Sequence, residues 1–582
     1  MITAYTGKTV LPYYPTTVDI ETAPDGTIIA CGFQWSENNG ERHYHAYDTV
    51  VEWFTDYIQL LRAYRYDKEI RKRLTRVYAH NGANFDYLSF YEFFNDSGAM
   101  AAAQYFTADS TGLGLQVELT ATGDTVLFLD SYRLLPQSLA ALTVTFNVEN
   151  IKQVVPAECK HNYLLFKTKY PELFWSYLKA DVMGLSEVVY AFWDQIFTLF
   201  GNVGHLPMTL PALVLRIFTK QLEADIYTPV RDNLKQLERA GYNGGLTLCM
   251  RTGVFDSVNV YDVNSMYPNV MRNDIYPISY VGYWSNEFET DRLGMWRATF
   301  KQHRQDVPPL LFDDKQGATY SGSGVYTTNE LNYLTRIGGE FTITQGYVYL
   351  KTAPLFETFI GNVYELRKTA IERGDSALAF ILKIMMNSLY GKFAQRETGD
   401  KIILANVALM RDMLENGTPY KVMGNWLIVA ETREVKHAFV AIAAMITANA
   451  RIDLHTRMCE VIDAGNEVYY CDTDSIHTNG SYNVSNELGG IKLENSGKAA
   501  YAGRKLYAFD GGKVKAKGIG RNVTRGTLSF KTIADIATNK ESKEAITFTR
   551  FPSVKGVLSE KEKAGVVTEM TRNIRNTGGI WD

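Results

Sequence analysis

Three acidic residues in two short motifs give the strongest chemical signal in this 582-residue chain. Asp472 and Asp474 lie one residue apart in YCDTDS, inside a strand-like run, and Asp262 lies more than two hundred residues earlier in YDVNSMYP. Clustered carboxylates repel one another unless cations hold them together. Two acids on different strands can bind a pair of divalent ions, which stabilises the attacking and leaving oxygens of an in-line phosphoryl transfer. The two motifs therefore predict metal-assisted phosphoryl transfer.

A third motif, KIMMNSLYG, lies between these acids in the sequence. Its Lys383, Asn387 and Tyr390 are spaced i, i+4, i+7 and share one face of a helix. A lysine can neutralise triphosphate charge, an asparagine can hydrogen-bond a nucleotide, and a tyrosine can stack near a base pair. Gly391 would leave space for that base pair. This helical face is therefore predicted to bind a nucleotide.

The three motifs, in this order, resemble the palm and fingers motifs of family B DNA polymerases. The resemblance implies that Asp262 binds both metal ions, with help from the backbone carbonyl of Val263. It implies that Asp474 bridges the metals and that Asp472 contributes less directly. Tyr267 would lie beneath the sugar of the incoming nucleotide and leave no room for a 2′-hydroxyl.

Two shorter motifs extend this resemblance to DNA contacts. Lys505 and Tyr507 match the K-x-Y motif with which the family holds the primer terminus. Tyr242, Gly244 and Gly245 match its YxGG motif, whose glycines let backbone amides approach a template phosphate closely. All five residues are expected to bind DNA.

Basic residues gather toward the C-terminus. From Lys498 onward the chain has 17 Lys and Arg against 8 Asp and Glu, a net charge of +9, so the remainder carries −13. Such a segment can grip a nucleic-acid backbone. Its Lys513, Lys515 and Lys517 alternate, as on one face of a strand. On the helix before KIMMNSLYG, the resemblance favours Lys368 over its neighbour for a second phosphate contact.

A separate acidic set lies near the N-terminus. Asp19 and Glu21, in TVDIET, are at i and i+2 of a strand, so their side chains point to one face. With Asp86 in NGANFD, and with Tyr177 and Asp181 in YLKAD, they resemble the three motifs of the DEDDy 3′–5′ exonucleases. The resemblance implies that the four carboxylates bind two metal ions on an RNase-H-like sheet and that the tyrosine orients the attacking water.

The same resemblance assigns the residues that hold a frayed primer end. They are Thr22, His80, Asn81 and Phe85. Two further contacts stay open. Tyr132 stands where the family has leucine after a serine, and Ser138-Leu139 is an alternative match. The supporting lysine of this centre is either Lys152 or Lys160.

Composition sets the broad class. Hydrophobic residues make up 46% and charged residues 21% of the chain, as in soluble globular proteins. Five scattered cysteines without a CxxC pair argue against a zinc site or a disulfide framework. We expect no signal peptide and no membrane span. The expected fold class is α+β multidomain, with an RNase-H-like α/β exonuclease domain followed by a right-hand polymerase carrying two β-rich insertions.

The pattern of motifs and turns predicts the domain order. The expected units are an exonuclease domain (1–190), a linker with the YxGG motif (191–260), palm (261–301), insertion 1 (302–356), fingers (357–394), insertion 2 (395–425), palm (426–496) and thumb (497–582). Strands are expected within 16–35, and helices over 50–76, 172–200 and 356–394, the last broken near ERGDS.

Small size, two insertions, NSLYGKFA and YCDTDSIH resemble the protein-primed branch of family B. The resemblance implies a monomeric, processive and strand-displacing enzyme that copies a linear phage or plasmid genome in the cytoplasm of a host cell. Its partners would be primer-template DNA, dNTPs and a terminal protein, with two Mg²⁺ or Mn²⁺ ions in each centre. Alternatives are a primer-independent polymerase, an exonuclease whose polymerase half only binds DNA, and a non-catalytic module. Asp-Thr-Asp disfavours a reverse transcriptase.

Overall fold

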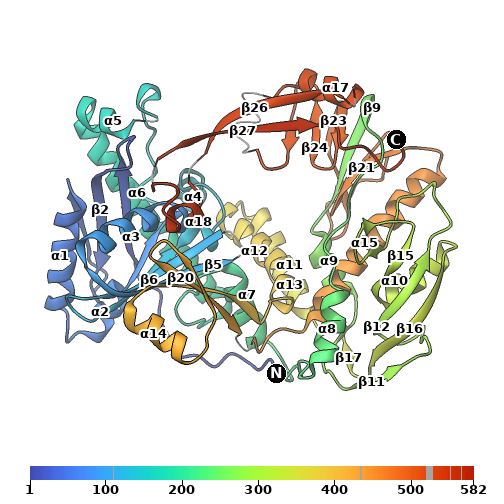
Figure 1. Cartoon of the computed structure of the whole chain (residues 1–582), viewed down its shortest axis with the longest axis horizontal. Coiled ribbons are helices and arrows are strands. Elements are labelled where there is room, and N and C mark those ends of the chain that lie inside the picture. The colour runs from blue at the N-terminus through green and yellow to red at the C-terminus, as the bar shows by residue number, and fades with distance from the viewer. Residues whose placement is uncertain are drawn as a thin grey trace.

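A computed structural model describes residues 1–108, 111–160, 162–432, 435–519, 528–539, 541–550, 552–564 and 566–582. Two large sheets, each flanked by helices, form its framework (Figure 1). The elements expected over 16–35, 50–76 and 172–200 are present. Within the described residues, no helix has both the length and the apolar character needed to cross a membrane.

The first sheet has ten strands in the order β19-β20-β18-β5-β6-β7-β4-β1-β2-β3. Its N-terminal members are β1 (Thr16–Thr22), β2 (Ile28–Ser36), β3 (Arg42–Tyr47), β4 (Arg76–Ala79), β5 (Met100–Ala108), β6 (Thr111–Leu119) and β7 (Thr125–Asp130). Strand β4 is parallel to both β1 and β7, so the carboxyl ends of these three strands share one edge. The helices α1 (Val50–Ala63), α2 (Lys68–Leu74), α3 (Asp86–Ser97) and α6 (Pro171–Phe200) pack on this sheet.

Three strands of this sheet come from far along the chain. They are β18 (Thr398–Leu404), β19 (Tyr420–Met423) and β20 (Trp426–Thr432), with α14 (Val407–Glu415) between them. Strand β18 pairs with β5, with Ile402 opposite Tyr105. Trp426 is fully buried against Tyr91 and Tyr105. The segment expected as insertion 2 therefore extends the N-terminal sheet.

The second sheet has seven antiparallel strands in the order β25-β24-β23-β9-β22-β21-β8. They are β8 (Thr247–Cys249), β9 (Gly253–Val263), β21 (Val468–Asp472), β22 (Ser475–Thr478), β23 (Ile491–Gly503), β24 (Leu506–Phe509) and β25 (Val514–Ala516). Helix α15 (Val440–Asp463) packs behind β21 and β22. It is buried over most of its length because it is apolar nearly all round.

Helices from the middle of the chain lie between the sheets (Figure 1). Helices α11 (Glu357–Glu372) and α12 (Ser376–Ser388) are the pair expected around ERGDS, and α13 (Tyr390–Phe393) follows. Helix α7 (Leu210–Lys220) packs against α12 and α13, while α9 (Met266–Asn273) packs against α11.

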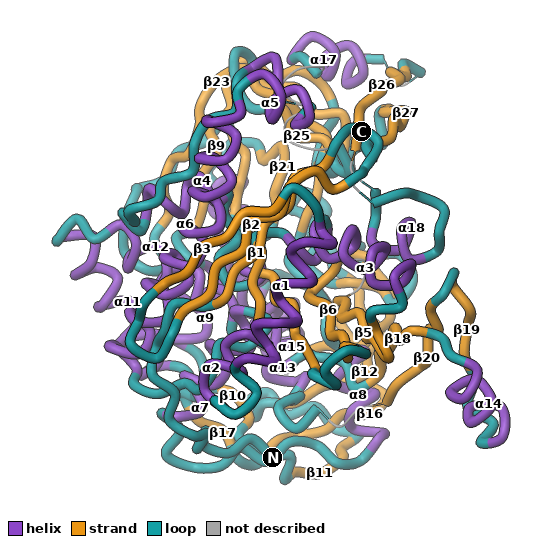
Figure 2. Tube along the Cα trace, turned by 90° about the vertical axis from the view of Figure 1, so that its left-hand side faces the viewer, coloured by secondary structure: helices purple, strands orange, loops and turns teal. Residues whose placement is uncertain are grey.

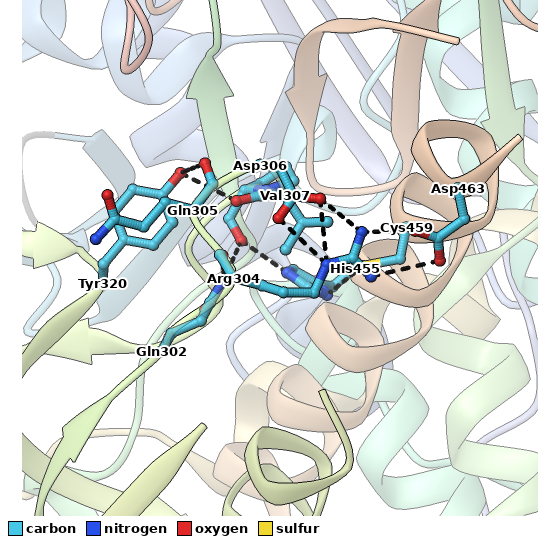
Figure 3. Close-up of polar contacts among 10 residues, drawn as sticks. Gln302, Arg304, Gln305, Asp306, Val307, Tyr320, His455, Cys459 and Asp463 are labelled. Atoms are coloured by element: carbon cyan, nitrogen blue, oxygen red, sulfur yellow. Dashed lines mark hydrogen bonds and ion pairs between the residues drawn. The ribbon is translucent and has the colours of Figure 1, made fainter. Parts of the chain in front are cut away.

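A smaller sheet, β11-β16-β12-β15, packs on the far side of α15. Its elements are β11 (Gly282–Ser285), β12 (Gly294–Lys301), β15 (Ser321–Thr327), α10 (Thr328–Arg336) and β16 (Glu340–Tyr349). Figure 3 shows how the loop after β12 meets α15. Arg304 pairs with Asp463 at 2.5 Å, and a ring nitrogen of buried His455 lies 2.7 Å from the Pro308 carbonyl.

The C-terminal segment bridges the molecule. After α17 (Phe530–Thr538), the ribbon of β26 (Lys543–Arg550) and β27 (Thr568–Arg575) runs toward the N-terminal sheet, and α18 (Val554–Leu558) lies between its strands in sequence (Figure 1). Helix α18 lies beside α3, as both views show (Figure 2). The backbone N–H of Ala564 donates to Glu92 Oε1 at 3.1 Å.

Three of the expected domain boundaries cut through paired strands. Residue 302 separates β12 from its partners β15 and β16, residue 425 separates β19 from β20, and residue 497 lies inside β23. We propose instead that the two β-rich insertions span 282–349 and 398–432, and that the thumb begins after β25.

Candidate active sites

The β21–β22 hairpin brings the three palm acids together. Thr473 has φ +66 in its tight turn, which places Asp472 and Asp474 on either side. Strand β22 pairs with β9 so that Ser475 lies opposite Asp262, and the N–H of Val263 donates to the Asp474 carbonyl at 2.8 Å. All three acids line one cavity of about 620 Å³. Sequence reasoning had placed them on separate strands, and the pairing explains why they meet.

Burial and charge repulsion act together on these acids. Burial, with the neighbouring carboxylate of Asp262, raises the pKa of Asp474 to about 7. Lys492, on the adjacent strand β23, lies with its Nζ 2.9 Å from Asp262 Oδ1. Lys505 Nζ lies 3.0 Å from Asp472 Oδ1, which also accepts from Thr247 at 2.9 Å. Such acid-rich, oxygen-donor surroundings suit a divalent cation.

The YxGG segment packs directly on this hairpin. A Cβ at Gly245 would lie 2.8 Å from Thr473 Cγ2, so only glycine fits there without movement. The N–H of Thr473 donates to the Leu246 carbonyl at 2.7 Å. Gly244 is exposed, and a Cβ there would meet open space. The two glycines therefore differ: one supports the hairpin and the other faces outward.

A buried ion pair supports the YxGG segment from behind. Arg451 of α15 is 1% exposed and donates to the carbonyls of Asn243 at 2.8 Å and Gly244 at 2.7 Å. The same guanidinium pairs with Glu330 of α10 at 2.6 Å, and Glu330 is 2% exposed. Sequence reasoning missed this arginine, because no short motif surrounds it.

The predicted nucleotide face is exposed on α12. Lys383 and Asn387 are exposed, and Gly391 would place a Cβ in open space. Tyr390 begins α13 and packs against Tyr267 of α9, with 4.4 Å between ring centroids. Lys368 of α11 lies 3.6 Å from Glu487. The structure thus brings the two predicted tyrosines together next to the palm.

The predicted primer contacts lie beside the acids. Tyr507 lines the same cavity as Asp262 and Asp474, and so do Lys513 and Lys515 on the turn and strand that follow. Lys505, with φ +57, holds Asp472 as described above. Lys517 is exposed, and its N–H donates to the Lys505 carbonyl at 3.0 Å.

The N-terminal acids converge at the shared edge of the first sheet. Carboxylate oxygens of Asp19, Glu21 and Asp181 all lie within 4.8 Å of one another. Asp86, at the start of α3, accepts from the Ile20 N–H at 3.3 Å. Burial raises the pKa of all four carboxyls, that of Asp86 to about 7. Asp181 Oδ1 is buried without a hydrogen-bond partner among the described residues, which fits a metal ligand.

Lys152 reaches this centre. Its Nζ pairs with Asp181 and donates to the Tyr177 hydroxyl at 2.9 Å, and the ammonium lies 4.5 Å from the Tyr177 ring centroid. Lys160 lies exposed after a short helical turn (Ala157–Cys159). The structure therefore favours Lys152 between the two lysines that the sequence left open.

The predicted primer-end residues surround the same edge. Thr22 closes β1, while His80 and Asn81 follow β4, and Phe85 precedes α3. His80 Nδ1 lies 2.9 Å from Ser131 Oγ. The N–H of Asn81 donates to Asp130 Oδ1 at 2.8 Å, a buried acid that sequence reasoning did not select. Ser138 caps α4 (Leu139–Thr145) instead, so Ser131 is the better match to the family's serine.

Comparison with known proteins decides the family. The sequence model described as DNA polymerase type B, organellar and viral, matches residues 172–482, more than half of the chain. The chain belongs to this family. Its members depend on divalent metal ions, and both acid clusters have the oxygen donors to bind them.

Individual relatives of this type B polymerase agree. The DNA-directed DNA polymerase of Enterobacteria phage PRD1 is 28% identical over 521 residues, covering 86% of this chain and 84% of that protein. The DNA polymerase of Streptococcus phage Cp-1 is 24% identical, covering 81% and 83%.

A solved structure confirms the predicted fold class. Phi29 DNA polymerase, complexed with primer-template DNA and incoming nucleotide substrates, superposes with a TM-score of 0.71 at 18% identity, over 98% of this chain and 100% of that one. An exonuclease-type α/β domain is followed by a right-hand polymerase with two β-rich insertions.

Proposed function

We propose that this type B polymerase copies a linear phage or plasmid genome from a protein primer and proofreads with its N-terminal domain. The observation that carries the synthetic function is the meeting of Asp262 and Asp474 across the β9–β22 pair. Phage relatives named DNA polymerases support the setting. We expect it to work as a monomer in the cytoplasm of a host cell.

Synthesis would take place at the palm cavity. Asp262, Asp474 and the carbonyl of Val263 would hold two Mg²⁺ ions, which lower the cost of charge on the attacking and leaving oxygens. Asp472, fixed by Thr247 and Lys505, keeps the hairpin in register. Tyr507 and Lys505 lie where they can hold the primer end, with its 3′-hydroxyl toward the α-phosphate of a dNTP.

The paired rings of Tyr267 and Tyr390 would form the floor beneath the sugar and base of the incoming nucleotide. A ring there excludes a 2′-hydroxyl by steric contact. Lys383, Lys368 and Asn387 would contact the triphosphate, because they present cations and an amide on the exposed side of α11 and α12. The open space at Gly391 suits a base pair.

Proofreading would take place at the edge of the N-terminal sheet. Asp19, Glu21, Asp86 and Asp181 would hold two Mg²⁺ ions, and Tyr177, fixed by Lys152, would orient the attacking water. The loop from His80 to Phe85, with Thr22, would hold the unpaired 3′ end. Aromatic and amide side chains suit a splayed strand.

The two centres can be tested separately. Asp474→Asn or Asp262→Asn should abolish dNTP incorporation in a primer-extension assay and spare degradation of single-stranded 3′ ends, since charge is lost while volume is kept. Asp19→Ala with Glu21→Ala should do the reverse. Loss of both activities in a folded variant would contradict two separate centres. Tyr267→Val should raise ribonucleotide incorporation relative to deoxyribonucleotide.

Protein priming needs its own experiment. We expect the enzyme to add a deoxynucleotide to a hydroxyl of a terminal protein encoded by the same genome. Co-expression with neighbouring gene products, then incubation with one labelled dNTP and Mg²⁺, should give a denaturation-stable protein–nucleotide adduct that requires Asp474. Templated synthesis without any primer or protein would instead place this chain in the primer-independent branch.

A further inference from the structure

A basic pocket lies outside both acid clusters. It is a surface cavity of about 430 Å³, and four cationic side chains line it: Lys8, Lys72, Arg76 and Arg216. No carboxylate is among the residues that line it. Within the described part of the chain, none of the four cations forms an ion pair. Like charges held together without a counter-ion are costly unless an anion joins them.

The pocket is built rather than incidental. Asn202 pins the N-terminal arm by donating to the carbonyls of Gly7 and Lys8 and accepting from the Val10 N–H, each at 3.1 Å. Gly204 has φ +70, and a Cβ there would lie 2.4 Å from the Tyr5 hydroxyl. Only glycine therefore leaves the cavity open at this point.

Backbone contacts fix two of the cations. Arg76 donates to the Leu206 carbonyl at 2.8 Å, and Arg216 donates to the His205 carbonyl at 2.7 Å. Each guanidinium has five N–H donors, so both keep donors for a ligand. His205 Nε2 is buried and has no hydrogen-bond partner among the described residues. The pocket thus offers fixed donors, mobile lysines and an unsatisfied ring nitrogen.

The chemistry of the lining points to a phosphate on a single strand. The guanidinium carbon of Arg216 lies 5.5 Å from the Tyr5 ring centroid, so an aromatic ring stands beside the cations. Proteins that bind single-stranded DNA combine these two features. The cavity volume suits one nucleotide unit and not a duplex.

The position of the pocket fits a strand that passes the catalytic domains. Arg76 and Leu127 lie at the amino ends of β4 and β7, the end opposite the exonuclease acids. Arg216 lies on α7, which packs against the nucleotide helix α12. The pocket therefore lies between the N-terminal sheet and the fingers.

We propose that this pocket binds the phosphate backbone of single-stranded DNA outside both catalytic centres. The strand is either the template ahead of synthesis or the displaced strand. The inference needs only that the chain is a DNA polymerase, and it does not depend on protein priming.

Binding to two substrates tests the proposal and identifies the strand. The variant is Lys8→Ala with Lys72→Ala, since both side chains are exposed. The charge-matched control is Lys68→Ala with Lys315→Ala, two exposed lysines outside the pocket, the first on the same helix α2. Fluorescence anisotropy across a salt series would compare a primer-template with a long 5′ template overhang and a fork with a displaced flap.

We expect the pocket variant to lose about 1.4 from the salt slope on one substrate, and roughly 10-fold in affinity at low salt, because each lost contact removes about 0.7. Loss on the overhang assigns the template, and loss on the flap assigns the displaced strand. An unchanged slope on both, or equal loss in the control, would overturn the proposal. Extension of a short-overhang primer should stay normal, which separates this result from a failure of the synthetic function.

Footprinting of the unmodified enzyme gives a second measurement. Oligo-dT should protect Lys8 and Lys72 from acetylation, read by mass spectrometry, while Lys68 and Lys315 should react as before. Equal protection by inorganic phosphate or dATP at matched phosphate concentration would mean a free-anion site and would overturn the strand assignment.

Discussion

At the scale of single residues, each acid cluster contains a lysine. Lys492 contacts Asp262, Lys505 contacts Asp472, and Lys152 contacts Asp181. The K-x-Y motif predicted Lys505, and the exonuclease resemblance left Lys152 as one of two choices. No sequence motif pointed to Lys492. It lies opposite Asp262 only because β23 pairs with β9 in that register, and strand register between distant segments cannot be read from the sequence.

The first prediction concerns Lys492. Because its ammonium and a divalent ion both bind Asp262, Lys492→Ala should tighten metal binding to the palm. The gain should be up to about fivefold, since a partly exposed ion pair contributes at most about 1 kcal/mol. Mn²⁺ titration followed by electron paramagnetic resonance measures it, in a variant lacking Asp19 and Glu21 so that only the palm is read.

Lys498→Ala is the control for this prediction. Lys498 lies on the same strand and pairs at 2.8 Å with the exposed Asp256, away from the acids. Its loss should leave metal affinity unchanged. Weaker Mn²⁺ binding in Lys492→Ala would show that the lysine supports the metal site and does not compete with it.

The second prediction concerns pH. Glu238 is 1% exposed and accepts from the Tyr349 hydroxyl at 2.7 Å, and burial raises its pKa from 4.5 to about 8. Between these values the unfolded chain loses this proton and the folded chain keeps it. Stability should therefore fall as pH rises through this window, by up to about 1.4 kcal/mol per unit. Glu238→Gln removes this contribution, so its Tm relative to the parent should rise from pH 5.5 to pH 8. A constant Tm difference would contradict the shift.

At the scale of elements, the acid hairpin depends on the segment packed against it. Gly245→Ala would bring a methyl group to 2.8 Å from Thr473 and shift the turn that carries Asp472 and Asp474. Because misplacement by about 1 Å can cost 100-fold in rate, we expect synthesis to fall by one to two orders of magnitude while exonuclease activity stays. Gly244→Ala, which adds a methyl group in open space, should leave Mn²⁺ binding to the DNA-free palm unchanged. Equal Mn²⁺ affinity in both variants would show that the turn tolerates the methyl.

The Arg451–Glu330 pair links the first β-rich insertion to the same segment. Either Arg451→Met or Glu330→Gln leaves one buried charge or donor unpaired, and breaking such a pair costs about 3 kcal/mol. Each single variant should melt at a lower temperature, and the double variant should recover most of the loss. Thermal unfolding by circular dichroism measures this. Additive losses in the double variant would mean that the two side chains act independently.

The sequence predicted local elements better than their pairing. Helical periodicity located α6, the α11–α12 pair and α15, because a helix is defined by neighbours in sequence. The strand-rich character of 395–425 was also visible. Its pairing with β5, some three hundred residues away, was not, since nothing local in either strand specifies the partner. For the same reason the expected boundaries at 302, 425 and 497 cut paired strands.

At the scale of the whole molecule, the chain closes on itself. The palm leads to the thumb, whose ribbon reaches the N-terminal sheet, and insertion 2 extends that sheet (Figure 1). Val554, Val557 and Leu558 of α18 are buried in the same core as Phe90 and Phe94 of α3. Gly424, between β19 and β20, would place a Cβ 2.6 Å from the Leu558 carbonyl. The contact of α18 with these two units therefore completes a closed path.

The last prediction tests whether this closure retains DNA. Gly26, in the β1–β2 turn, has φ +87, and a Cβ there would lie 2.5 Å from the Ala564 carbonyl, so Gly26→Ala should push the thumb segment away from the N-terminal sheet. Gly40 has the same φ of +87 with nothing within 4 Å, so Gly40→Ala carries the same backbone strain without the clash. We expect Gly26→Ala to shorten the products made in one binding event, measured with a DNA trap, while the rate of a single incorporation is unchanged in both variants. Equal product lengths for the two variants would show that this contact does not hold the enzyme on DNA.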